Sequence, residues 1–300
     1  MLDVPVPDIT PKTANLCIGD IETYSTNYNS DNEYYWTVTG GAADCTGCDA
    51  WIDVEAEITV EWTTTGNRTI TVIERVKDSD PVVSGTTSQG YVIYPQPSPF
   101  NLSASPVCSG SSADVEVDVS EVGTTYQLRL HPDNTPVGGS YAGNGDPLPL
   151  PTGAITTTTT YNVRAYNLGC ELVSNPIEVT VYALPTLTLD NVGGEVCDGD
   201  PAGLKITFSS STAVYTIRIY DDGDEHDDSP LDQESAPSSP HTFAPNMVWT
   251  GPAASNVHPF TAVIIDDNGC ESVPVAPVEV TVWKIPETGP QYHIPNDHGL

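Results

Sequence analysis

The chain has 300 residues, which is too long for one small β-sandwich and fits two or three domains. Its formal net charge is −32, with only 9 Lys and Arg residues. That scarcity excludes a nucleic-acid binder, which needs a basic face, and it disfavours binding to an anionic membrane surface. Thr, Val, Ser, Pro, Gly and Tyr are abundant and the common helix formers are scarce, so we predict an all-β protein.

A Cys-x-Gly motif recurs three times, at Cys17, Cys108 and Cys197. The spacings are 91 and 89 residues, which is the length of one small immunoglobulin-like sandwich. The chain therefore reads as three repeats that begin in the same way.

The elements of repeat 1 follow in chain order. Tyr35, Trp36 and Val38 indicate a central strand, and residues 91–94 indicate the last strand. Pro95 then marks the boundary of the repeat, because proline cannot continue a sheet and stiffens a connector.

Repeats 2 and 3 share a second set of signals. The alternations Tyr126/Leu128/Leu130 and Tyr215/Ile217/Ile219 predict half-buried strands. A Gly-Cys pair then precedes each final strand, which we place at residues 177–181 and 278–282. The predicted domains are 1–95, 96–185 and 186–284, with a tail at 285–300, and the prolines at the junctions predict an extended row.

Seven cysteines suggest an oxidised, extracellular protein. We expect one bridge within each later repeat, Cys108 to Cys170 and Cys197 to Cys270, each stabilising by roughly 4 kcal/mol in the chain-entropy model. Free thiols at these positions, or bridges between repeats, would contradict this pairing.

The remaining cysteines are Cys17, Cys45 and Cys48. Cys45 and Cys48 form a C-x-x-C motif, but no second pair of ligands supports zinc and no βαβ context supports a redox site. We predict a short local disulfide between them, or a bridge from Cys17 to one of the two. One cysteine is left over, either free or paired with another chain.

Repeat 1 resembles the PKD-like domains of large exported Bacteroidetes proteins, in residues 16–19, 35–41, 58–62 and 70–72. Repeats 2 and 3 resemble the immunoglobulin-like repeats of the same proteins, through residues 107–110, 158–165, 168–171 and 268–272. The resemblance implies stalks and modules of gliding-motility adhesins, surface filaments and type IX-secreted proteins. Repeat 1 departs from the pattern because it lacks the late Gly-Cys, and no C-terminal sorting domain is recognisable.

An acidic run in repeat 3 suits Ca²⁺, which takes six to eight oxygen ligands. The candidate ligands are Asp221, Asp222, Asp224, Asp227 and Asp228. No Glu closes an EF-hand frame, and a solvated hairpin loop is the alternative interpretation. We expect no required cofactor beyond this candidate Ca²⁺.

Two tryptophans, Trp51 and Trp249, are candidates for a carbohydrate-binding face, whereas Trp36 and Trp62 lie in strand patterns and are predicted core residues. None of the six histidines lies in a metal pattern, and no nucleophile elbow or phosphate loop is present. We therefore predict no catalytic residue and no enzyme activity.

The first residues, Met1 to Pro5, lack a basic start and an apolar segment, so we interpret the chain as a mature or excised piece of an exported protein. A cytosolic protein is the alternative. No apolar run reaches the roughly 20 residues of a membrane span.

Our first functional hypothesis is a non-catalytic structural and adhesive segment of a bacterial surface or secreted protein. Its partners would be neighbouring domains and a glycan or other cell-surface ligand. The alternatives are a carbohydrate- or Ca²⁺-dependent binding module and a fibre subunit that assembles by strand exchange.

Overall fold

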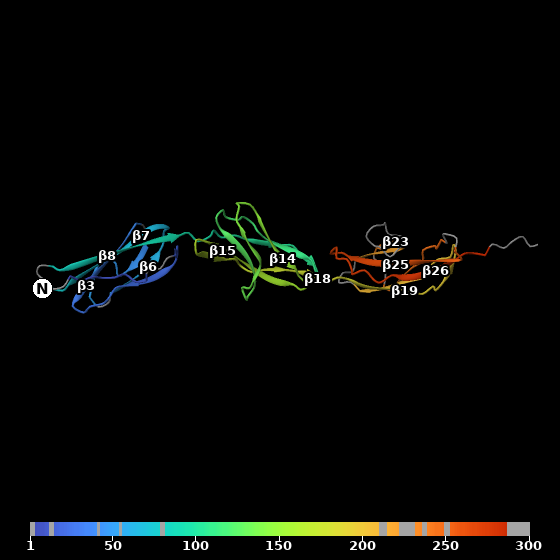
Figure 1. The fold of residues 1–300 in the computed structure, drawn as a ribbon, viewed down its shortest axis with the longest axis horizontal. Coiled ribbons are helices and arrows are strands. Elements are labelled where there is room, and N and C mark those ends of the chain that lie inside the picture. The colour runs from blue at the N-terminus through green and yellow to red at the C-terminus, as the bar shows by residue number, and fades with distance from the viewer. Residues whose placement is uncertain are drawn as a thin grey trace, which may run out of the picture. The chain divides into compact units, whose positions relative to one another are not determined.

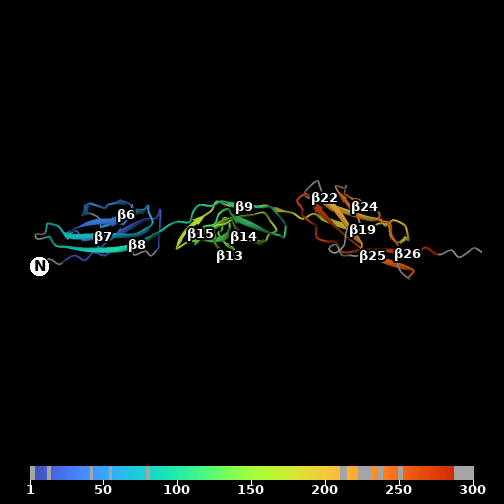
Figure 2. The same ribbon diagram turned by 90° about the horizontal axis from the view of Figure 1, so that it is seen from above.

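A computed structural model of the chain describes residues 4–11, 15–40, 43–53, 56–78, 82–209, 215–221, 232–235, 239–248 and 253–286. These residues form strands and turns and contain no helix, as the composition predicts. Figures 1 and 2 show the strands as layered sheets. The fold is all-β, and three pairs of sheets follow one another in the sequence.

The chain divides into two compact units. Unit 1 comprises Met1–Ser105, Ser112–Gly153 and Thr159–Val179, and unit 2 comprises Pro106–Ser111, Ala154–Thr158 and Thr180–Leu300. The domain boundaries at 95, 185 and 284, and the extended row, stay predictions.

The first pair of sheets lies in unit 1 and corresponds to repeat 1. Its five-stranded sheet has the order β1-β8-β7-β3-β5, and its three-stranded sheet has the order β2-β6-β4. Figure 2 shows β6 in the layer above β7 and β8. The strands are β1 (Leu16–Cys17), β2 (Ile21–Ser25), β3 (Asn32–Thr39), β4 (Ala43–Thr46), β5 (Trp51–Ile52), β6 (Glu57–Trp62), β7 (Gly66–Val76) and β8 (Ser84–Tyr94).

The second pair of sheets also lies in unit 1, with the orders β14-β11-β9 and β13-β12-β15-β16, and β17 pairs with β15. The alternation predicted from Tyr126 is β12, with Tyr126 and Leu128 buried. The strands are β9 (Leu102–Ala104), β11 (Ser112–Val117), β12 (Thr125–Leu130), β13 (Pro136–Ala142), β14 (Leu148–Ala154), β15 (Thr159–Asn167), β16 (Cys170–Val173) and β17 (Ile177–Val179).

Unit 2 contains a short parallel ribbon and the third pair of sheets. The ribbon joins β10 (Val107–Cys108) to β18 (Val181–Tyr182). The two sheets have the orders β19-β21-β24 and β20-β26-β25-β22-β23. Figure 1 shows β19, from the first sheet, below β25 and β26, from the second. The strands are β19 (Thr186–Asn191), β20 (Val196–Cys197), β21 (Leu204–Ser209), β22 (Tyr215–Asp221), β23 (Asp232–Ser235), β24 (His241–Phe243), β25 (Ser255–Asp266) and β26 (Val278–Trp283).

The five-stranded sheet has the order of an immunoglobulin-like sandwich, in which strands C, F and G lie side by side. In repeat 1 these strands are β3, β7 and β8, and β3 pairs antiparallel with β7 from Asn32↔Val76 to Thr39↔Thr69. Their alternate side chains, Trp36, Ile70 and Val72, are fully buried against the second sheet, where Trp62 is also fully buried. The prediction that Trp36 and Trp62 are core residues is confirmed. Tyr35, which lies 91 residues before Tyr126 and so matches it in the repeat, is only half-buried.

Candidate functional site: the bridged junctions of the repeats

The first Cys-x-Gly motif forms a corner at the end of repeat 1 where the chain leaves the sandwich. Cys17 pairs in parallel with Tyr94, the last residue of β8. The Ile18 N–H then donates to the Tyr94 carbonyl at 3.0 Å, and the Asp20 N–H donates to the Cys17 carbonyl at 3.0 Å. Gly19 turns the chain with φ +91°, a conformation that favours glycine. The corner therefore places Cys17 beside the exit of its own repeat.

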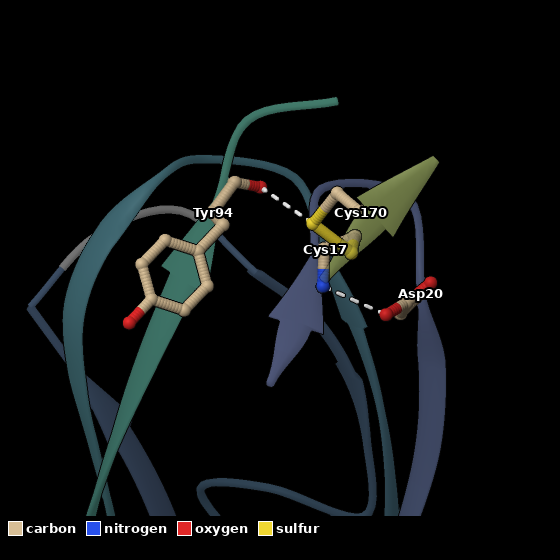
Figure 3. The surroundings of a disulfide bond; sticks show 4 residues. All are labelled: Cys17, Asp20, Tyr94 and Cys170. Carbon is tan, nitrogen blue, oxygen red and sulfur yellow. Dashed lines mark hydrogen bonds between the residues drawn. A yellow bond between two sulfur atoms is a disulfide. The ribbon is translucent and has the colours of Figure 1, made fainter. Parts of the chain in front are cut away.

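Cys17 is bonded to Cys170, which lies in the next repeat (Figure 3). The two Cα atoms are 5.7 Å apart, within the range that a disulfide requires. The Cys17 N–H donates to the Asp20 carboxylate at 2.7 Å, and the Cys170 Sγ lies 3.9 Å from the Tyr94 carbonyl oxygen. The bond therefore joins the exit of repeat 1 to a cysteine of repeat 2.

Cys170 is presented by a tight turn that follows β15. Asn167 pairs with Cys170 across this turn, Gly169 has φ +93°, and Cys170 itself is fully buried. A Cβ at Gly169 would lie 3.2 Å from the Asn15 side chain, so the turn approaches repeat 1 closely and a larger residue would crowd it. The Gly-Cys pair is thus the surface by which repeat 2 contacts the corner of repeat 1.

The second corner repeats this arrangement inside unit 2. Cys108 pairs with Tyr182, and the Ser109 N–H donates to the Tyr182 carbonyl at 2.8 Å. Cys108 is bonded to Cys270, with the Cα atoms 5.5 Å apart. Cys270 follows β25, is fully buried, and its N–H donates to the Asp266 carboxylate at 2.9 Å. The bridge again joins the corner of one repeat to the late Gly-Cys of the next.

The expected pairing within repeats is therefore wrong. Cys108 is not bonded to Cys170, and Cys197 is not bonded to Cys270 but is free and exposed. The reason is clear in repeat 3, where Cys197 and Ser255 both pair with Trp283, at the start of β25, and Cys270 follows its far end. Because β25 has 12 residues at about 3.3 Å each, the two cysteines lie tens of ångströms apart, far beyond the ~7 Å limit between Cα atoms of a disulfide.

Cys48 is also disulfide-bonded, and the side chain of Cys45 lies outside the described residues. Cys17 is bonded elsewhere, so the alternative that it pairs with Cys45 or Cys48 is wrong. The sequence held one signal for the true pairing: repeat 1 has a corner cysteine but no late Gly-Cys. A pairing shifted by one repeat supplies Cys17 with a partner.

The candidate Ca²⁺ ligands are mostly outside the described part of the chain, which omits Asp222, Asp224, Asp227 and Asp228. Asp221 is described, and its carboxylate lies 2.9 Å from Nδ1 of His258. Among the described residues, no group of three or more His, Cys, Asp or Glu side chains could hold a metal ion. Calcium binding stays a prediction for the segment after Asp221.

Of the two candidate carbohydrate-binding tryptophans, Trp249 lies outside the described residues. Trp51 is 38% exposed, its ring centroid is 5.3 Å from that of Tyr35, and the Arg75 guanidinium carbon lies 3.8 Å above the ring. Glu33 holds this arginine in place, with a distance of 2.6 Å between its Oε2 and an Arg75 nitrogen. One face of Trp51 is therefore covered by a cation rather than open to a sugar.

A hollow of about 430 Å³ in unit 1 is lined by residues of the N-terminal segment, of the loop before β3, and of the end of β7, including Glu74. Glu74 is buried and accepts hydrogen bonds from the Asn32 amide at 2.6 Å and the Tyr34 hydroxyl at 3.2 Å. These contacts give the carboxylate a structural role at the end of β3 and β7. In the part of the chain that the structure describes, no helix is long and apolar enough to cross a membrane.

No protein-family model matches the chain, and no curated protein matches it. Among solved structures, the eight N-terminal Ig domains of the Down syndrome cell adhesion molecule are 10% identical over 94% of this chain, with a TM-score of 0.41. This chain covers 37% of that structure. The fibronectin(III)-like modules of Clostridium thermocellum CbhA are 16% identical over 65% of this chain and all of theirs, with a TM-score of 0.34. The assignment to immunoglobulin-like sandwiches rests on the strand order above.

Proposed function

We propose that this chain is a non-catalytic, load-bearing segment of a bacterial cell-surface or secreted adhesin. The observation that carries this proposal is the pair of bridges between successive repeats. Disulfides of this kind persist in oxidising compartments, which supports a place outside the cytosol. The resemblance of residues 16–19, 107–110 and 168–171 to exported Bacteroidetes repeats supports the bacterial surface and type IX secretion as its setting.

The two bridges overlap in the sequence, and this overlap limits how far the chain can be pulled. Without bridges, the 253 residues from Cys17 to Cys270 would extend to about 890 Å. With both bridges, the shortest covalent path crosses from Cys17 to Cys170, runs back along the chain to Cys108 and crosses to Cys270, a path of 62 residues or about 220 Å.

Two longer paths run in parallel with it. One follows the chain from Cys17 to Cys108 and crosses to Cys270, which is 91 residues, and the other crosses from Cys17 to Cys170 and follows the chain to Cys270, which is 100 residues. The shortest path sets the cap while both bridges are closed, and either bridge alone still caps the extension, at about 320 or 350 Å. An adhesin stalk needs this property, because its domains are pulled between a cell and a surface.

Single-molecule force extension of the full chain, held at its two ends, tests the proposal. A Cys197→Ser background removes the free thiol of the bridged chain. Adding Cys170→Ser opens one bridge and leaves the path of 91 residues, so we expect the cap to rise by about 100 Å. Adding Cys108→Ser as well opens both bridges, and the extension between Cys17 and Cys270 should rise by about 570 Å more.

A gain of about 220 Å on adding Cys170→Ser, which is the length of a separate loop from Cys108 to Cys170, would show that the loops do not overlap as described. An identical extension in all variants would show that the bridges carry no load. Treatment with a reductant gives the matched control, because it should convert the chain with both bridges to the behaviour of the double variant.

A further inference from the structure

The third Cys-x-Gly corner has the same backbone structure as the two bridged corners. Cys197 pairs in parallel with Trp283, the last residue of β26, as Cys17 pairs with Tyr94. The Asp198 N–H donates to the Trp283 carbonyl at 3.0 Å, and the Asp200 N–H donates to the Cys197 carbonyl at 2.9 Å. Gly199 has φ +87°, against +91° at both Gly19 and Gly110.

Two features distinguish this corner from the others. Cys17 and Cys108 are bonded and half-buried, whereas Cys197 is free and exposed. Its neighbour Trp283 is 42% exposed, whereas Tyr94 and Tyr182, at the same register position, are half-buried. The backbone of this corner is built as in the other repeats, but its cysteine forms no disulfide.

The partner in both bridged corners is the late Gly-Cys of the following repeat, and both cysteines of this kind in the chain are already bonded. We propose that Cys197 is the attachment thiol for a further immunoglobulin-like unit on the C-terminal side, and that it bonds to a cysteine in the Gly-Cys turn of that unit. This inference rests on the three equivalent corners and not on the load-bearing role.

The bond forms by thiol–disulfide exchange. The Cys197 thiolate attacks a disulfide oxidant, forms a mixed disulfide and releases one thiolate. The thiolate of the incoming Gly-Cys turn then attacks the Cys197 sulfur and releases the second thiolate. Two protons and two electrons leave the cysteine pair, and the oxidant, here a small disulfide such as oxidised glutathione, is reduced to two thiols.

A four-repeat chain tests this assignment directly. A copy of residues 186–286 is placed immediately after Pro286, in place of residues 287–300, which reproduces the junction after Pro185. The chain is refolded in glutathione buffer, digested without reduction and mapped by mass spectrometry. We expect Cys197 of the original repeat to be linked to the copy's equivalent of Cys270, with one free thiol, the copy's own corner cysteine.

The control is the same chain with Cys270→Ser in the appended copy, which should leave two free thiols and an unlinked Cys197. In both chains the bonds Cys17–Cys170 and Cys108–Cys270 report that the original repeats have folded. A free Cys197 beside these intact bonds would overturn the proposal. A bond between Cys197 residues of two molecules would also overturn it, because it would show that a second copy is the partner.

Discussion

Repeats 1 and 3 build five-stranded sheets of the same order around different cores. Repeat 1 fills its core with aromatic rings, and the centroid of Tyr91 lies 5.1 Å from that of Tyr24 and 6.2 Å from that of Trp62. Repeat 3 fills the equivalent space mainly with aliphatic side chains, which include Leu204, Ile206, Ile217, Ile219, Ile264, Val280 and Val282. The comparison teaches that two features specify this sandwich: the alternation of buried and exposed side chains along the strands, and the Cys-x-Gly corner at the end of the repeat. The core side chains themselves can be aromatic or aliphatic.

The largest expected effect comes from opening one junction. Replacing Cys17 and Cys170 with Ser removes a bridge across 153 residues, which is worth about 5 kcal/mol in the chain-entropy model. Hydrogen exchange read by mass spectrometry should show faster opening of β3 and β7 in repeat 1 and unchanged protection of β22 and β25 in repeat 3. Equal loss of protection in repeats 1 and 3 would contradict the expectation that this bridge stabilises only the junction between repeats 1 and 2. Cys197→Ser is the control and should change neither.

The aromatic core of repeat 1 offers a matched pair of tryptophans. The Trp62 indole N–H donates to the Tyr24 hydroxyl at 3.3 Å, whereas Trp36 Nε1 is buried and donates no hydrogen bond within the described residues. Trp62→Phe leaves the buried Tyr24 hydroxyl without its donor, but Trp36→Phe removes an unpaired donor. Trp62→Phe should lower the free energy of unfolding, measured in urea, by about 1–3 kcal/mol more than Trp36→Phe does. An equal cost for the two variants would show that the hydrogen bond adds nothing.

Repeats 1 and 3 should differ in their stability at alkaline pH, because their cores differ in tyrosine content. Burial raises the pKa of Tyr34 and of Tyr91 from 10.0 to about 12, and it also raises the pKa of Tyr24. Because the folded chain keeps these protons longer than the unfolded chain does, their stabilisation is complete below pH 10 and is lost as the pH rises through 12. The core cluster of repeat 3 contains no tyrosine among its described members.

We therefore expect repeat 1 to unfold before repeat 3 as the pH rises above 10. Tyrosinate absorbance should rise together with the loss of near-UV circular dichroism, and hydrogen exchange at lower temperature should assign the first loss to β3 and β7. Simultaneous unfolding of both repeats would show that the buried tyrosines do not set the alkaline limit.

The smallest effect is expected on the outer face of repeat 1. Arg75→Gln removes the cation over Trp51 and the ion pair with Glu33. Both interactions are partly exposed to solvent, so the variant should lose about 1 kcal/mol or less of its free energy of unfolding. Tryptophan fluorescence should shift to longer wavelength as Trp51 becomes more exposed. A loss as large as that of a core variant would show that this face contributes to the core.

Much of the fold could be predicted from the sequence, because strands leave a local pattern. The alternation at Tyr126 and Leu128 predicts β12, and residues 278–282 predict β26, since every second side chain enters the core. The spacing of Cys17, Cys108 and Cys197 identifies three repeats with the same corner. The spacing of 91 residues matches Tyr126 with Tyr35, but the side chain that enters the core of repeat 1 is that of Trp36.

The pairing of the cysteines could not be read from that pattern. Symmetry between repeats 2 and 3 favours a bond inside each, but the direction of β25 places Cys197 and Cys270 at opposite ends of one strand. The direction in which a strand runs is a property of the folded sheet, and it cannot be predicted from the spacing of residues in the sequence. The missing late Gly-Cys of repeat 1 was the one local sign that the pairing is shifted.

Disulfide mapping of the unreduced protein tests the central claim, that each repeat is bonded to the next. Digestion without reduction followed by mass spectrometry should yield one peptide pair that joins Cys17 to Cys170 and another that joins Cys108 to Cys270, with Cys197 recovered as a free thiol. Recovery of Cys108 linked to Cys170, and of Cys197 linked to Cys270, would contradict it.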